Sequence, residues 1–120
     1  MTEEQQEDAY QSLGVDEIIY LPDRLQELWS NIPAKQASIK NVLLPLQNWL
    51  TQESSSDDYV LVQGDFGAVY LMVEWSFAND LNPVYSTTLR KTVEERVDNE
   101  IKIKKTFKHQ LFRGYEKLNN

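Results

Sequence analysis

The pattern of apolar and polar residues predicts a helix followed by a short strand at the start of the chain. Residues 3–13 form a polar segment that Thr2 can cap, because its hydroxyl can accept a backbone N–H at the helix start. Gly14 can end this helix, since glycine adopts the left-handed conformation at low cost. The apolar run 18–21 then predicts a short buried strand.

Two amphipathic helical stretches follow. Residues 25–32 are apolar at positions i, i+3, i+4 and i+7, which places these side chains on one helix face. A second stripe extends over 38–52, and Pro45 lies inside it. Because a proline removes one backbone hydrogen bond from a helix interior, we expect this helix to be kinked or to restart near Leu44.

The middle of the chain predicts a strand, a glycine turn, a helix and a second strand. Residues 59–62 are apolar without alternation, which is typical of a parallel strand covered on both faces. The turn 63–67 and the helical segment 68–78 come next, and 84–88 is again strand-like. Strands that alternate with helices favour right-handed crossovers and a parallel sheet.

The C-terminal part of the chain has a different period. Residues 89–97 and 101–107 lie on either side of the turn 98–99, and the alternation after the turn predicts a half-exposed antiparallel hairpin. The expected fold is α/β: a single Rossmann-like domain over 1–120, with a mostly parallel sheet flanked by helices. The segment 89–117 would be a basic antiparallel β-hairpin extension of that domain.

Composition excludes several classes of protein, and charge singles out one segment. The absence of cysteine excludes disulfides, thiolate metal sites and a cysteine nucleophile. No apolar run approaches the roughly 18 residues of a membrane span, and no secretory signal is visible, so a cytoplasmic location is expected. The net charge is −7, but residues 101–117 carry six Lys or Arg against Glu116 alone. This segment is either a solvated strand face or a positive field for an anion.

The glycine turn after the strand at 59–62 is the first candidate site. Residues Gly64 to Gly67 follow a strand and open a helix, where unpaired backbone N–H groups favour phosphate. Asp65 is itself negative, so it would cap the helix or bond a ribose hydroxyl instead. A tight structural turn explains the same spacing equally well.

Hydroxyl and cationic side chains in the segment 86–91 make the second candidate. Ser86, Thr87 and Thr88 supply three hydroxyls. Arg90 suits a phosphodiester, because a guanidinium can bind two oxygens at once and stays charged. The alternative is an ordinary threonine-rich strand.

Two further places hold groups that could act on a nucleotide. His109 is the side chain that titrates near neutrality, so it could be a general acid or a hydrogen-bond donor to a phosphate. A lone histidine is more often a surface or packing residue. Trp29, Ser30 and Asn31 place an aromatic ring beside two polar side chains at a helix end, where a simple helix terminator is the alternative. No Ser/His/Asp order, zinc motif or carboxylate pair stands out in the sequence.

Together these places resemble a known family. Similar motifs occur in a small Csx-type family of CRISPR-associated, Rossmann-like proteins that accompany type III CRISPR systems. The resemblance covers nearly the whole chain. It rests on four runs of residues, which are Leu28–Pro33, Tyr59–Ala68, Pro83–Arg90 and Phe107–Arg113.

The resemblance implies a ring nuclease, an antiviral-defence protein that cuts cyclic oligoadenylate and so switches the type III response off. Such proteins work as homodimers without cofactor or metal, because a ribose 2′-hydroxyl of the substrate attacks the phosphate and leaves a 2′,3′-cyclic phosphate. Cyclic tetra-adenylate is the expected ring, and neither duplex DNA nor a membrane is an expected partner. By position, catalytic roles fall to Arg90, His109 and Asp65. The residues implied in ligand binding are Gln63, Gly64, Phe66, Gly67, Ser86, Thr87, Thr88, Arg113, Trp29, Ser30 and Asn31.

The sequence departs from that family at its start. In the family an apolar strand precedes the first helix and contributes a polar loop to the pocket, whereas this sequence begins at the helix. Either the true start lies upstream of Met1, or this member lacks the strand and would be expected to bind the ring without cutting it. Two other functions therefore stay open: a non-catalytic sensor of a cyclic nucleotide, and an adaptor that binds RNA or protein through the basic hairpin.

Overall fold

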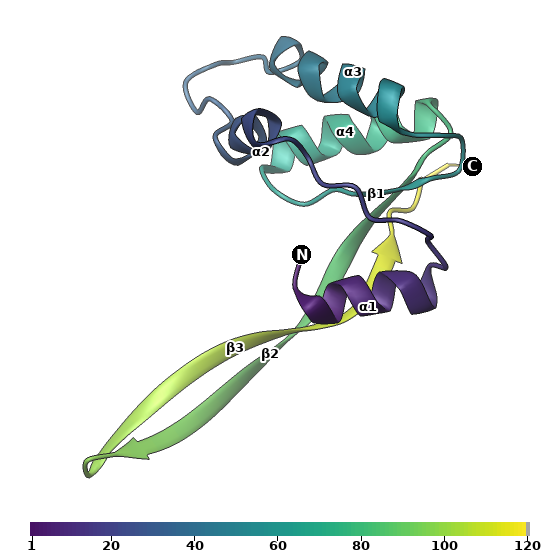
Figure 1. Ribbon diagram of the computed structural model, residues 1–120. Helices are drawn as coiled ribbons and strands as arrows, with labels where there is room; N and C mark the ends of the chain where they lie inside the picture. The colour runs from purple at the N-terminus through teal and green to yellow at the C-terminus, as the bar shows by residue number, and fades with distance from the viewer. Residues whose placement is uncertain (120) are drawn as a thin grey trace. The chain divides into compact units, whose positions relative to one another are not determined.

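The structure is a computed structural model that describes residues 1–119. It is an α/β fold with a three-stranded mixed sheet, in the strand order β1–β2–β3, flanked by helices. β1 pairs with β2 in parallel, with Val60 opposite Pro83, and β3 follows β2 through a two-residue turn. None of the described helices is long and apolar enough to cross a membrane. The elements in chain order are α1 (Glu3–Ser12), α2 (Asp23–Ser30), the 3-10 helix η1 (Asn41–Leu43), α3 (Leu44–Glu53), β1 (Tyr59–Leu61), α4 (Phe66–Ala78), β2 (Asn82–Val97) and β3 (Glu100–Gly114) (Figure 1).

The chain divides into two compact units, each of which has its own internal contacts. Unit 1 combines Met1–Glu17 with Ser86–Arg113, so it is built from α1 and most of the hairpin. Unit 2 combines Ile18–Tyr85 with the segment that starts at Gly114. Strand β2 begins in unit 2 and continues into unit 1.

Unit 2 packs three helices, α2, α3 and α4, on one side of β1 (Figure 1). On the other face of β1, Tyr59 and Leu61 keep 44% and 37% of their surface exposed. The prediction of a strand covered on both faces is therefore wrong, because the side chains on this face stay accessible to solvent. The buried residues of the core are Leu25, Leu43, Leu46, Val62, Ala68 and Met72.

Tyr115 ties the end of the chain to the sheet of unit 2. Its backbone N–H donates to the carbonyl of Pro83 at 3.0 Å, and its hydroxyl donates to the carbonyl of Val62 at 2.6 Å. Its ring lies 4.7 Å from that of Tyr85. Burial is the main cause that raises the pKa of the Tyr115 hydroxyl, and Tyr85 adds to it. The hydroxyl is therefore a hydrogen-bond donor over the whole physiological range.

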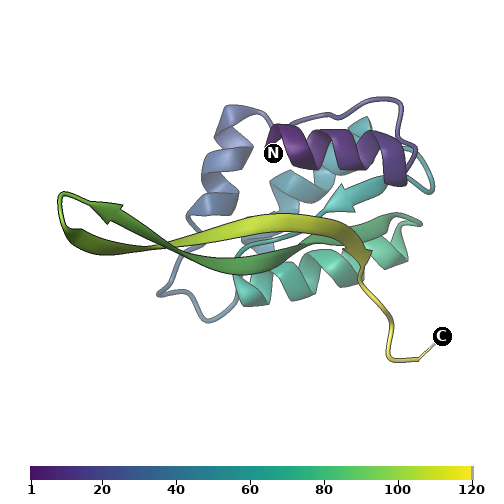
Figure 2. The same cartoon turned by 90° about the horizontal axis from the view of Figure 1, so that it is seen from below.

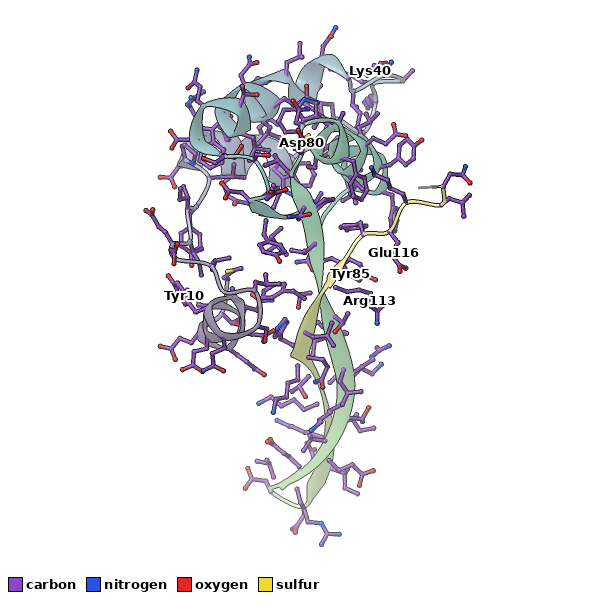
Figure 3. All side chains as sticks on the ribbon, turned by 90° about the vertical axis from the view of Figure 1, so that its right-hand side faces the viewer. Tyr10, Lys40, Asp80, Tyr85, Arg113 and Glu116 are labelled. Atoms are coloured by element: carbon purple, nitrogen blue, oxygen red, sulfur yellow. The ribbon has the colours of Figure 1, made fainter. Side chains whose placement is uncertain are left out.

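Unit 1 consists of α1 and the twisted two-stranded ribbon of β2 and β3 (Figure 2). At the ribbon's tip, Asp98 and Asn99 have φ of 51° and 64°, which is the left-handed pair that a tight two-residue hairpin needs. Residues 88–108 are all exposed, and their side chains project from both faces of the ribbon (Figure 3). Around Ser86 and His109 the ribbon is covered by α1, whose Ala9 is buried.

Several sequence predictions are confirmed in their position and cause. The first helix is capped by Thr2, which accepts from the N–H of Gln5, and the Gln5 side chain accepts from the N–H of Thr2 in return. The helix expected to restart does so at Leu44, after η1. Pro45 then lies in the first turn of α3, where a missing N–H breaks no helical hydrogen bond.

Two strand predictions are wrong. Residues 18–21 form no strand, and Ile19 and Tyr20 are about half exposed, because no neighbouring strand pairs with this apolar run. The strand expected at 84–88 does not end there, since β2 is one continuous strand of 16 residues. The parallel part of the sheet is consequently the single pair β1–β2.

Candidate functional site

Three polar side chains of unit 1 form a continuous hydrogen-bonded chain. His109 of β3 lies between Ser86 of β2 and Asp8 of α1. Its Nδ1 is 2.5 Å from the Ser86 hydroxyl oxygen, and its Nε2 is 2.7 Å from Oδ2 of Asp8. We call Ser86, His109 and Asp8 the relay.

The local structure of α1 fixes the carboxylate of this relay. Asp8 precedes the buried Ala9, which anchors this turn of the helix, and the hydroxyl of Ser12 donates to its other oxygen, Oδ1, at 2.5 Å. The hydrogen bonds from Ser12 and then from His109 lower the pKa of Asp8, although burial opposes them. The carboxylate is therefore charged at neutral pH and accepts hydrogen bonds on both oxygens.

The imidazole of His109 is enclosed on all sides. Only 5% of the side-chain surface of His109 is exposed, against 21% for Asp8. The ring of Phe112 lies 4.7 Å away at an angle of 49°. Both ring nitrogens are occupied, so the imidazole is held in one orientation.

Hydroxyl and cationic groups extend from the relay along the two strands. The Thr87 hydroxyl is within 3.2 Å of both the N–H and the carbonyl of Leu111, so it bridges β2 and β3. Thr88 is exposed on β2 and Arg113 is exposed near the end of β3. Arg90 lies four residues beyond Ser86, about 13 Å along an extended strand. Its guanidinium sits 5.6 Å above the ring of Phe107 rather than against the relay.

The other predicted site residues gather in unit 2. A cavity of about 380 Å³ is lined by side chains from α2 and by the turn before α4. The indole N–H of Trp29 donates to the carbonyl of Gln63 at 2.8 Å, which fixes the ring against this turn. The residues that line the cavity are Gln26, Trp29, Ser30, Ile32, Gln63, Gly64 and Asp65.

Three predicted residues near this cavity have local roles or point elsewhere. Asp65 caps α4, where its carboxylate accepts the N–H of Ala68 at 3.0 Å. Asn31 donates its side-chain amide to the carbonyl of Glu27, and it does not line the cavity. Phe66 is 95% exposed at the start of α4.

Most of the predicted residues thus fall into two sets, the relay with its neighbours in unit 1 and the cavity in unit 2, whereas Asn31, Phe66 and Gly67 do not line the cavity. Sequence reasoning named Ser86 and His109 but missed Asp8, which completes the relay from 101 positions away. It also missed Gln5, whose amide lies 3.4 Å from the Ser86 hydroxyl. Neither residue carries a motif, and the polar face of a surface helix gives no sign of which carboxylate meets a histidine.

Comparisons with known proteins place the chain in one family. The family model described as "Uncharacterized protein MJ1673 family" matches residues 1–113. The chain is similar to "Uncharacterized protein MJ1673" of Methanocaldococcus jannaschii, with 47% identity over 115 residues, which cover 96% of this chain and 89% of that protein. No solved structure matches the chain. The relay and the cavity both fall within the matched residues, and the chain belongs to the MJ1673 family.

Proposed function

We propose that this protein is a metal-independent ring nuclease that binds and cleaves cyclic oligoadenylate, with cyclic tetra-adenylate as its first candidate substrate. In this role it would switch off type III CRISPR signalling as a cytoplasmic homodimer. The β1–α4–β2 unit, one parallel strand pair with its crossover helix, would be its Rossmann-like element. The proposal rests on the family resemblance of the motifs together with the arrangement of polar groups in unit 1.

One observation carries the proposal: the contact between Ser86 and His109. The two residues come from separate motifs, 23 positions apart, and their side chains meet at 2.5 Å. A hydroxyl that is hydrogen-bonded to an imidazole is an arrangement suited to proton transfer. Cleavage by a substrate 2′-hydroxyl requires such a proton transfer and a favourable environment for negative charge on the phosphate.

The charge of the ribbon supports an anionic substrate. Between residues 86 and 113, Lys and Arg number eight and Asp and Glu number four, although the whole chain carries −7. Arg90 and Arg113 flank the relay along the strands, one on each. A substrate with several phosphates spaced around a ring can contact both ends of such a surface.

The cavity in unit 2 supports a nucleotide ligand through different chemistry. Ligand sites are typically concave, with an aromatic wall and a few polar groups, and about 300 to 1,000 Å³ in volume. The Trp29 ring, the Ser30 hydroxyl and the backbone at Gly64 line a space of about 380 Å³ and so meet that description. We assign this cavity to a nucleobase and its ribose.

The test is incubation with cyclic tetra-adenylate in the presence of EDTA, followed by chromatography of the products. We expect linear products that end in a 2′,3′-cyclic phosphate. Arg90→Gln should lower the rate at least about tenfold, as expected for a lost phosphate contact. Lys35→Gln, which removes an exposed cation from unit 2, is the matched control and should cleave normally.

The other outcomes identify the alternatives. An intact ring that co-elutes with the protein would indicate a non-catalytic sensor. Absence of binding to this ring and to cyclic hexa-adenylate would overturn the proposal.

The exposed ribbon favours one second candidate function, an RNA-binding adaptor. Lys102, Lys104 and Lys105 are exposed on β3, and Phe107 keeps 67% of its surface accessible, as in sites that pair cations with a stacking ring. This function predicts binding of long single strands that weakens steeply with salt. Replacing the three lysines by glutamine should abolish this binding and lower ring cleavage far less.

A further inference from the structure

The burial of His109 restricts how the relay can reach a substrate. With 5% of its side chain exposed and a partner on each ring nitrogen, the imidazole has no free nitrogen to present. Asp8 lies on the far side of the ring and accepts from Ser12 as well. Ser86 is half-buried, and besides His109 its hydroxyl oxygen lies 3.4 Å from the side-chain amide nitrogen of Gln5. Chemistry at this centre must therefore pass through the Ser86 hydroxyl.

The hydrogen-bond pattern assigns the protons. An ionised carboxylate can only accept, so Nε2 of His109 carries the hydrogen that bonds Asp8. Nδ1 then has a lone pair and accepts from the hydroxyl of Ser86. A hydroxyl that donates to an imidazole, which in turn donates to a carboxylate, is the arrangement that activates serine in unrelated hydrolases. Here the order of the two ring nitrogens is reversed, but the direction of proton flow is the same.

We propose that Ser86 is the catalytic hydroxyl of this centre, and that His109 and Asp8 are positioning residues that act through it. The inference rests on the proposed function for its substrate, a phosphodiester with a neighbouring 2′-hydroxyl. The Ser86 oxygen accepts the proton of the 2′-hydroxyl while Ser86 passes its own proton to Nδ1 of His109. The 2′-oxygen forms a bond to phosphorus, the bond from phosphorus to the 5′-oxygen breaks, and the leaving 5′-oxygen takes a proton from water. The imidazolium, stabilised by Asp8, returns its proton through Ser86 to solvent.

The activated hydroxyl can be detected without any cyclic nucleotide. Diisopropyl fluorophosphate reacts with such a serine: the oxygen bonds phosphorus, fluoride leaves, and the proton goes to His109. We expect mass spectrometry to find the adduct on Ser86 in the whole protein. Labelling should fall at least about a hundredfold in Asp8→Asn and His109→Gln, in line with the usual contribution of a positioned base.

Matched controls separate activation from folding. Glu7→Gln removes one negative charge from the neighbouring position of α1, where the side chain is exposed, and should label like the wild type. Asp8→Asn keeps the shape of the side chain, so normal circular dichroism with lost labelling supports the relay. Equal labelling in Asp8→Asn and wild type, or no adduct on Ser86, would overturn it.

Ring kinetics then distinguish this inference from the function on which it rests. If the ring is cleaved, Ser86→Ala should lower kcat at least about a hundredfold with little change in KM, and Asp8→Asn should do the same. Ser56→Ala, which removes an exposed hydroxyl from a loop of unit 2, should leave both constants unchanged. Full cleavage by Ser86→Ala would refute the relay and leave the ring nuclease standing. Labelling of Ser86 without ring cleavage would confirm the relay and refute the substrate.

Discussion

Substitution of Gly64 by alanine tests the geometry of the unit 2 cavity. Gly64 has φ of 154°, a backbone conformation that residues other than glycine rarely adopt. A Cβ at this position would lie 2.9 Å from Nε1 of Trp29 and 3.1 Å from its Cε2. The indole cannot retreat without lengthening its 2.8 Å hydrogen bond to the carbonyl of Gln63. Gly64→Ala should therefore strain the backbone and displace Trp29 together.

The expected cost follows from these two effects. An unfavourable backbone conformation costs about 1–3 kcal/mol, and the loss of one hydrogen bond about 0.5–1.5 kcal/mol. We expect the free energy of unfolding of unit 2 to fall by about 2–4 kcal/mol. Gly114→Ala is the control, because a Cβ there meets no atom within 4 Å and φ is not left-handed; it should change stability by less than about 0.5 kcal/mol.

Urea unfolding followed by tryptophan fluorescence measures this loss of stability in unit 2. All three tryptophans, Trp29, Trp49 and Trp75, lie in unit 2, so the signal reports that unit. The midpoint should shift without a change in slope. In a Trp29→Phe background, the same glycine substitution should cost only its backbone part. The measurement error is about 0.5 kcal/mol. A free energy of unfolding for Gly64→Ala that lies within that error of the wild-type value would refute the reasoning.

Three further predictions concern the core, the chain end and the pH dependence. Leu43→Ala removes a fully buried side chain and should lower the free energy of unfolding by about 2–5 kcal/mol in the same fluorescence assay. A loss below about 1 kcal/mol would mean that the helices move together and fill the space left by the leucine. Tyr115→Phe leaves the Val62 carbonyl without its hydroxyl donor and should cost about 1–2 kcal/mol, whereas Tyr59→Phe, at an exposed ring, should cost almost nothing. Because the pKa of Asp8 is lowered by folding, its contribution to stability is complete above the ordinary value of 3.8 and is lost as pH falls through the native pKa. In NMR spectra, the amide signals of α1 should therefore weaken on acidification below pH 3.8, and Asp8→Asn should remove that pH dependence.

Local signals in the sequence located most of the elements. Thr2 caps a helix because of its own hydroxyl, and Pro45 starts one because of its own missing N–H. The turn at Asp98 and Asn99 depends on two adjacent residues that tolerate positive φ. The apolar run 18–21 misled for the opposite reason, since a strand exists only where a second strand pairs with it, and pairing is not a local property.

The candidate site shows the same division. Most residues that line the cavity were predicted because a glycine turn and a helix end are visible in the sequence, but Gln26 and Ile32 were not among them. Ser86 and His109 were named for their chemistry, but nothing in the sequence indicated that they touch. Asp8 could not be found at all, because its role depends on α1 lying against β3 rather than on its neighbours in the chain.

The construction of unit 1 from two distant segments has a consequence for biosynthesis. Asp8 and His109 are separated by 101 positions, so the loop they close includes all of β1 and α4. At a synthesis rate of about 5–20 residues per second, α1 leaves the ribosome roughly 5–20 seconds before the strand it packs against exists. During that interval the polar helix has no tertiary partner, and short helices are marginal in water by themselves. The relay is thus among the last features of the nascent chain to form, and any chemistry it performs is withheld until β3 has been made.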